Sequence, residues 1–133
     1  MYENKYEVKK DIIYPQEVFE IVGIMYDVWN SVGYGHKESF YEKAAAEIFR
    51  KRKKNFQEQL RCEVKLGEKS LGVYIFDFIY EDKIVIELKK GEVFPKHNIE
   101  QIYAYLKATK LKLGLLINFT SNGVKFKRIV NIK

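Results

Sequence analysis

Two short apolar segments of this chain each carry an acidic residue at a position where a buried strand would hold an apolar one. Asp77 interrupts the aromatic and β-branched run of residues 74–80, and Glu87 follows the apolar residues 84–86. Aspartate is depleted from strands, and a buried charge costs several kcal/mol unless it is paired or bound to a cation. These two acids therefore require either positively charged partners or a metal ion.

A lysine lies close to both acids if the two segments form a hairpin. Side chains two residues apart on a strand share a face, so Lys89 faces the same way as Glu87. A turn around Glu81 and Asp82 would make Asp77 the cross-strand neighbour of Glu87. Carboxylate oxygens with few imidazoles nearby favour magnesium or manganese over zinc. The spacing thus predicts a Mg²⁺ or Mn²⁺ site, with a structural ion pair between Lys89 and the acids as the alternative.

The elements around this cluster predict an α/β fold. Helical spacing of apolar residues predicts three helices, over residues 15–32, about 36–53 and 95–108. Alternating or continuous apolar runs predict five strands, over residues 56–66, 71–80, 83–89, 113–119 and 124–132. Because the first connections between strands are short and polar, the first three strands should form an antiparallel meander. The expected order is helix, helix, three-strand meander, helix and two strands, in a mixed β-sheet flanked by α-helices.

The third predicted helix carries a polar residue that could face the acids. Its apolar face is formed by Ile99, Ile102, Tyr103 and Leu106. Gln101 and Tyr105 are four residues apart and share a face, which we expect to differ from the apolar one. This face would be available to the site, although a glutamine on an ordinary solvated surface is the alternative.

Composition limits the class of protein. A chain of 133 residues has the length of one domain, so we expect a single domain over residues 1–133, with residues 1–14 as a flexible N-terminal segment. The net charge of +6 favours polyanionic partners. One cysteine, Cys62, cannot form an internal disulfide, and the N-terminus lacks the apolar core of a signal peptide, so we expect a cytoplasmic protein. No segment approaches the roughly 20 apolar residues that cross a bilayer, so we expect no membrane partner.

The order of these motifs is similar to that of a known group of nucleases. Asp77, followed ten residues later by Glu87, Leu88 and Lys89, resembles the core of the PD-(D/E)XK nuclease superfamily. Residues 35–41 spell Gly-x-x-Glu-x-x-Tyr, the motif that names the GxxExxY family within it, and residues 101–105 are similar to the Gln-x-x-x-Tyr motif of many exonuclease-type members. Where many members have proline before the aspartate, this chain has Phe76, which removes no ligand.

The resemblance implies a restriction-endonuclease-like fold and a role for each matched residue. Divalent metal, Mg²⁺ or Mn²⁺, would be held by Asp77, Glu87, the backbone carbonyl of Leu88 and Glu38. Lys89 would orient or help to deprotonate the attacking water, and Gln101 would position the water, the lysine or the substrate strand. Further candidates for substrate contact are Tyr34, Lys90, His97 and Tyr105.

The implied function is metal-dependent hydrolysis of phosphodiester bonds in DNA, in repair, recombination or defence. The alternative is a non-catalytic module that keeps the nuclease fold to bind nucleic acid or a protein partner. The oligomeric state stays open, and a homodimer is one of the assemblies that would let such a nuclease act on both strands of a duplex.

Overall fold

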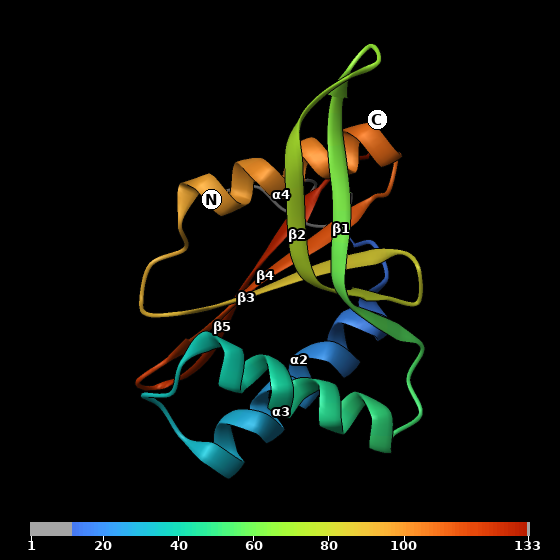
Figure 1. Cartoon of the computed structure of the whole chain (residues 1–133). Helices are drawn as coiled ribbons and strands as arrows, with labels where there is room; N and C mark the ends of the chain where they lie inside the picture. The colour runs from blue at the N-terminus through green and yellow to red at the C-terminus, as the bar shows by residue number, and fades with distance from the viewer. Residues whose placement is uncertain (1–11, 133) are drawn as a thin grey trace, which may run out of the picture.

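A five-stranded sheet with helices on both faces forms the part of the chain that the computed structural model describes, residues 12–132 (Figure 1). The helices are α2 (Pro15–Val32), α3 (Glu38–Lys51) and α4 (Lys96–Thr109). The strands are β1 (Phe56–Leu66), β2 (Lys69–Tyr80), β3 (Ile84–Lys90), β4 (Leu113–Thr120) and β5 (Gly123–Val130). Most of the predicted flexible segment, residues 1–11 of 1–14, lies outside the described residues.

The strands lie in the sheet in the order in which they occur along the chain. β1, β2 and β3 are antiparallel neighbours, so the predicted meander is confirmed. β4 then pairs parallel with β3 after the crossover through α4, and β5 returns antiparallel to β4. The sheet is therefore mixed, and the α/β fold class predicted from the sequence is confirmed.

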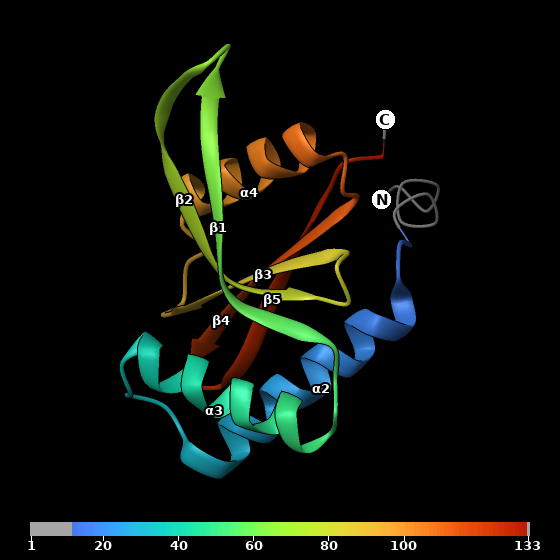
Figure 2. The ribbon, with the colours of Figure 1, turned by 45° about the vertical axis from the view of Figure 1, so that its right-hand side comes forward.

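Two apolar layers hold the helices against the sheet. On one face, α2 and α3 pack through residues such as Ile21, Met25 and Phe49 against the strands. On the opposite face, α4 packs through Ile102 and Leu106. Figure 2 shows these helices on opposite sides of the sheet. Within residues 12–132, none of the helices combines the length and apolar character that crossing a bilayer would need.

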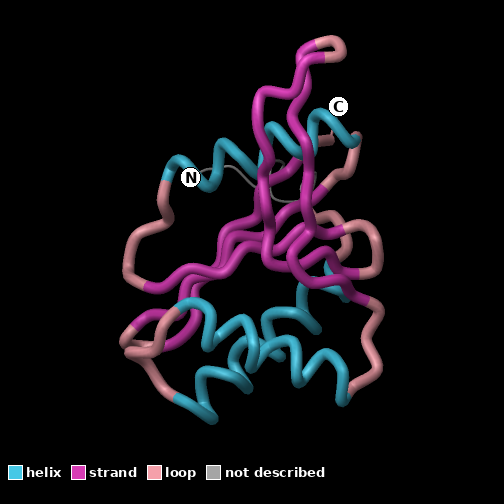
Figure 3. Tube along the Cα trace, in the orientation of Figure 1, coloured by secondary structure: helices cyan, strands magenta, loops and turns pink. Residues whose placement is uncertain are grey.

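Strands β2 and β3 diverge near their acidic residues. Their register runs from Tyr80 opposite Ile84 to Phe78 opposite Ile86, and β2 then continues into the hairpin that it forms with β1. The trace in Figure 3 shows this hairpin projecting away from the rest of the sheet. The divergence places Asp77 and the residues after Ile86 at the point where the two strands separate.

At the same point, strand β2 passes from one apolar core to the other. Phe78 belongs to the core under α2 and α3, whereas Phe76, two residues earlier on β2, belongs to the core under α4. Strict alternation would place both rings on one face of a flat sheet. The strand therefore turns at Asp77, whose side chain lies between the two layers.

Some predicted boundaries and one predicted face are wrong. Helix α3 begins at Glu38, not near residue 36, because Lys37 is extended with ψ of 153°. On α4, Tyr103 is 38% exposed and Tyr105 only 8% exposed. Tyr105 lies three residues after Ile102 and so shares the core face with it, contrary to the expectation of a separate face. Its ring packs 5.0 Å from that of Phe76.

Candidate active site

Asp77 and Glu87 face each other across the divergence of β2 and β3. Glu87 Oε1 accepts a hydrogen bond from the backbone N–H of Asp77 at 3.1 Å, and Asp77 Oδ2 accepts one from the backbone N–H of Leu88 at 2.7 Å. Each carboxylate thus bonds to the backbone of the other strand. The predicted cross-strand neighbourhood of the two acids is present, with the side chains bridging strands that begin to part.

The electrostatics of this pair favour protonation in the absence of a cation. Burial, and then the facing charge of Glu87, raise the pKa of Asp77 from 3.8 to about 8, and the Leu88 N–H opposes the shift. Burial also raises the pKa of Glu87, against the effects of the Asp77 N–H and of Lys89. A nearby cation favours the ionised form of both groups.

Helix α3 brings a third acid to the site. Glu38 lies in its first turn, where Oε1 is 3.6 Å from Lys89 Nζ and Oε2 accepts a hydrogen bond from the Lys90 N–H at 3.3 Å. The ion pair of Lys89 is therefore with Glu38, whereas the structural alternative drawn from the sequence had paired it with Asp77 and Glu87. Glu38 joins the start of α3 to the end of β3.

The tyrosine of the Gly-x-x-Glu-x-x-Tyr motif holds this helix start in place. Tyr41 is fully buried and its ring stacks on that of Phe119 with centroids 4.1 Å apart. Its hydroxyl donates to the carbonyl of Gly33 at 2.8 Å. The motif therefore fixes the loop before α3 against β4, and this fixes the position of Glu38 one turn earlier on the helix.

A fourth acid, Glu42, was not predicted from the sequence. It lies one helical turn after Glu38, and its proximity to Asp77 contributes to raising the pKa of that carboxyl group. The side-chain amide of Gln59 on β1 donates to Glu42 Oε2 at 2.6 Å. The spacing of four residues from Glu38 could have indicated a shared face, but only the fold shows that this face meets β1 and β2.

The remaining predicted site residues lie on α4, at the end of β3 and in the loop before α3. On α4, the Gln101 side-chain nitrogen is 2.9 Å from His97 Nε2, so these two polar groups contact each other. Lys90 and Tyr34 are exposed, and Tyr34 is in the loop before α3. Tyr105 packs in the core under α4 and is 8% exposed.

The acids of the site suit a hard divalent cation by chemical type. Glu38, Glu42, Asp77 and Glu87 all offer carboxylate oxygens, the ligands that magnesium and manganese prefer. Within residues 12–132, no three acidic, histidine or cysteine side chains already converge as an ion would require. One oxygen each of Asp77 and Glu87 accepts a hydrogen bond from backbone, which leaves the other oxygen of each carboxylate for a cation. The four carboxylates therefore fit a divalent cation by chemical type.

Asn118 anchors the loop between β3 and α4. It is in register with Lys89 and is fully buried, and its side-chain nitrogen donates to the carbonyls of Gly91 at 3.2 Å and Val93 at 2.9 Å. This buried amide fixes the segment that follows Lys89. The sequence predicts only that Asn118 belongs to an apolar strand. A polar residue inside such a strand was the signal that could have indicated this anchoring role.

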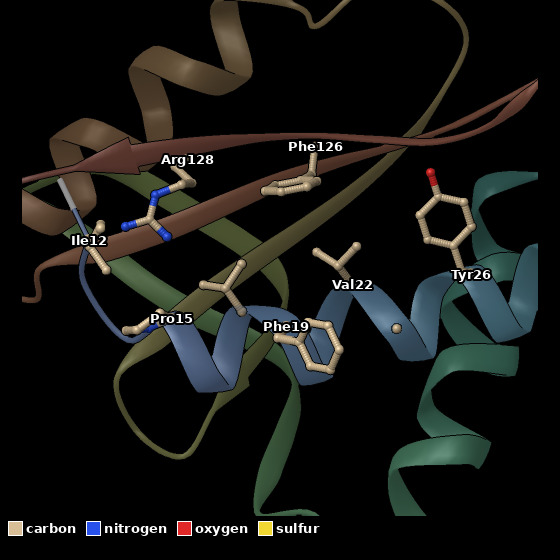
Figure 4. Close-up of a pocket in the computed structure, with 9 residues that line it drawn as sticks. Ile12, Pro15, Phe19, Val22, Tyr26, Phe126 and Arg128 are labelled. Carbon is tan, nitrogen blue, oxygen red and sulfur yellow. The ribbon is translucent and has the colours of Figure 1, made fainter. Parts of the chain in front are cut away.

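An apolar groove of about 810 Å³ lies elsewhere, between α2 and β5. Figure 4 shows Phe19, Val22 and Tyr26 of α2 on one side of it and Phe126 and Arg128 of β5 on the other. Arg128 donates to the carbonyl of Ile13 at 3.2 Å. None of the four acids lines this groove, so its volume does not mark the candidate active site.

Comparisons with known proteins bear on the fold and the family of this chain. The crystal structure of SSO0001 has a similar fold, with a TM-score of 0.52 at 20% sequence identity, over 70% of this chain. The matched part is 49% of that protein, so this chain spans about half of its length. None of the curated proteins compared with the chain matches it. The model of one family, described as the PD-(D/E)XK nuclease superfamily, matches residues 15–129, which include all four acids and Lys89. The chain therefore belongs to the PD-(D/E)XK nuclease superfamily.

Proposed function

We propose that this chain is a Mg²⁺- or Mn²⁺-dependent nuclease that hydrolyses phosphodiester bonds in DNA. The observation that carries the proposal is the facing pair of Asp77 and Glu87, with Lys89 two residues further along β3. Membership of the superfamily supports nuclease chemistry, and the net charge of +6 supports a polyanionic substrate. Repair, recombination and defence are the processes that such an activity would serve.

The residues of the site divide the work of hydrolysis. Asp77, Glu87, the Leu88 carbonyl and Glu38 would hold the divalent ion, which supplies Lewis-acid stabilisation of charge at the phosphate. The Lys89 side chain, whose Nζ is 3.6 Å from Glu38 Oε1, would orient the attacking water or help to deprotonate it, and would stabilise developing negative charge at the phosphate. Water adds to phosphorus and one P–O ester bond breaks, which leaves a phosphate monoester and a free hydroxyl.

Other predicted site residues would position the nucleic acid. We assign Gln101 and His97, in contact on α4, to the substrate strand, the lysine or the water. The exposed side chains of Tyr34 and Lys90 are further contacts in this proposal. Because unpaired bases stack on aromatic rings and phosphates bind lysine, these two residue types suit a nucleic-acid strand.

The proposal also includes membership of the GxxExxY family, a homodimeric assembly and a cytoplasmic location. The role of Tyr41 in fixing Glu38 supports membership of the GxxExxY family. A homodimer belongs to the proposal for duplex substrates, because a single set of acids cuts one strand at a time. A single cysteine, which suits a reducing compartment, supports a cytoplasmic location.

The decisive experiment is a cleavage assay with single-stranded, duplex and branched DNA in Mg²⁺, in Mn²⁺ and in chelator. We expect cleavage that requires the ion and is lost in Asp77→Asn and in Glu87→Gln. A non-catalytic binding module would instead bind DNA with an affinity that falls with salt, and would be indifferent to Asp77→Ala or Glu87→Ala. Absence of ion-dependent cleavage on all three substrates would overturn the proposal.

A further inference from the structure

Gln59 has an unusual backbone for a residue within a strand. Its φ is 54°, in the left-handed region that non-glycine residues rarely occupy. It lies between Glu58, which pairs with Phe78, and Leu60, which pairs with Phe76, and it is therefore opposite Asp77. Such a conformation costs free energy and persists where the surrounding structure enforces it, often at functional sites.

The left-handed residue directs two successive side chains of β1 to the same helix. Glu58 Oε2 accepts a hydrogen bond from Arg50 on α3 at 2.8 Å, and the next side chain, Gln59, donates to Glu42 on α3 at 2.6 Å. In a regular strand these neighbours would point to opposite faces. The strained backbone therefore serves to bring the Gln59 amide to Glu42.

Glu42 in turn contacts the acid at the centre of the site. Its carboxyl group is close enough to that of Asp77 to raise the pKa of Asp77, and Gln59 lies opposite Asp77 on the neighbouring strand, so Gln59, Glu42 and Asp77 are neighbours from β1 through α3 to β2. The amide of Gln59 occupies Glu42 Oε2 and fixes its rotamer. Without this contact, the partly exposed Glu42 side chain would be free to adopt rotamers that point away from Asp77.

We propose that Glu42 is an additional ligand of the divalent cation and that Gln59 is the positioning residue that holds it beside Asp77. The inference rests on the proposed function, because it concerns the same cation site. It extends the set implied by the family motif, namely Asp77, Glu87 and Glu38, by one carboxylate on α3. It also gives a reason for the left-handed backbone of Gln59.

The test measures Mn²⁺ affinity, from the paramagnetic resonance signal of free Mn²⁺, together with the melting temperature in chelator. Glu42→Gln should weaken Mn²⁺ binding by about 10-fold or more, and Gln59→Gly by about 10- to 100-fold, the effect typical of residues that orient metal ligands. Because glycine adopts a left-handed backbone without strain, Gln59→Gly should not lower the melting temperature. If Gln59 had only a structural role, Gln59→Gly would not weaken Mn²⁺ binding while the melting temperature stays unchanged.

Two matched control variants test whether the loss of any acid from α3, or any glycine in β1, would weaken Mn²⁺ binding. Glu47→Gln removes an exposed acid from the same helix, and it should leave Mn²⁺ affinity unchanged. Gln57→Gly changes a glutamine on the same strand whose partner is Ile79 in regular register. It should lower the melting temperature, since glycine weakens a regular strand, and leave Mn²⁺ affinity unchanged.

The outcomes distinguish this inference from the proposed function. If wild type binds Mn²⁺ and Asp77→Asn abolishes binding, while Glu42→Gln and Gln59→Gly bind as wild type does, the inference is overturned and the proposed function stands. If Gln59→Gly binds weakly only because it unfolds, Glu42→Gln decides the role of the carboxylate, since it alters no backbone. If wild type binds no Mn²⁺, both the inference and the metal-dependent function are overturned.

Discussion

The Glu87 carboxylate accepts a hydrogen bond from the backbone N–H of Asp77, and the two residues lie on strands that part from each other at this point. The Asp77 carboxylate does the same for the N–H of Leu88. Strand amides that would otherwise lack a partner are thus satisfied by the acids of the candidate site. Each acid therefore completes the sheet as an acceptor, a role separate from the metal binding that we propose for it.

The stability of the metal-free protein should fall as pH rises from about 4 to about 8. In this range Asp77 stays protonated in the folded chain, where its pKa is about 8, and ionises in the unfolded chain, near 3.8. The folded state then binds more protons than the unfolded state, so raising the pH favours unfolding. Melting temperatures measured in chelator at several pH values in this range test the prediction. In Asp77→Asn the melting temperature should depend less steeply on pH. An equal pH dependence in both proteins would contradict the assignment of the effect to Asp77.

Replacing Asp77 by asparagine and by alanine should separate its two roles. Both variants should lose cleavage, because neither supplies a carboxylate. Asparagine keeps an oxygen that can accept from the Leu88 N–H, whereas alanine leaves that donor without it. An unsatisfied buried donor costs about 1–3 kcal/mol, so Asp77→Ala should be less stable than Asp77→Asn by that amount. Denaturant unfolding in chelator measures the difference, and equal stabilities would show that the hydrogen bond contributes little.

Lys89→Met should reduce activity far more than stability. Loss of a group that stabilises charge in the transition state costs about 100- to 1,000-fold in turnover. The Lys89–Glu38 pair is partly exposed, with side chains 26% and 41% accessible, and such a pair contributes about 0–1 kcal/mol. Turnover measures the expected loss of activity, and the melting temperature of the same preparation measures the expected small change in stability. Lys127→Met, at an exposed site on β5, is the control and should keep wild-type turnover.

Gly114→Ala should destabilise the protein through the contact of α4 with the sheet. A Cβ atom at this position of β4 would collide with Ile102 on α4 and lie 3.0 Å from Val85 Cγ1 on β3. Overpacking of this kind costs about 1–3 kcal/mol. Gly23→Ala has the opposite expected sign, because nothing lies within 4 Å of that Cβ on α2 and alanine is favoured over glycine in a helix by about 1 kcal/mol. Chemical denaturation of both variants compares the two effects.

The fold could be predicted from the sequence because its strands and helices carry clear periodic patterns. The continuous apolar run of β4 indicated a strand buried on both faces, and all of its residues are buried. The short connection at Glu81 and Asp82 indicated the turn that sets Asp77 opposite Glu87, and the register of β2 and β3 agrees. Local spacing was sufficient in both cases.

The contributions of Glu42, Gln59 and Asn118 could not be predicted in the same way. Glu42 and Gln59 are 17 residues apart and meet only because β1 takes a left-handed turn at Gln59. No periodicity marks such a turn at a residue other than glycine. Tyr105 was misplaced for a related reason. A position three residues after Ile102 lies near the edge of the apolar face, and the ring of Phe76 from the hairpin decides that it is buried.

Because β2 separates from β3, the sheet consists of two parts that should differ in their free energy of local opening: the β1–β2 hairpin and strands β3–β5. Three residue pairs join β2 to β3, whereas seven join β3 to β4. The β1–β2 hairpin can therefore open as a local unit at lower free energy than the β3–β4–β5 part, a difference that amide hydrogen exchange would register. Asp77 belongs to the first part and Glu87 to the second. Local opening of the hairpin would therefore increase the distance between the two carboxylates.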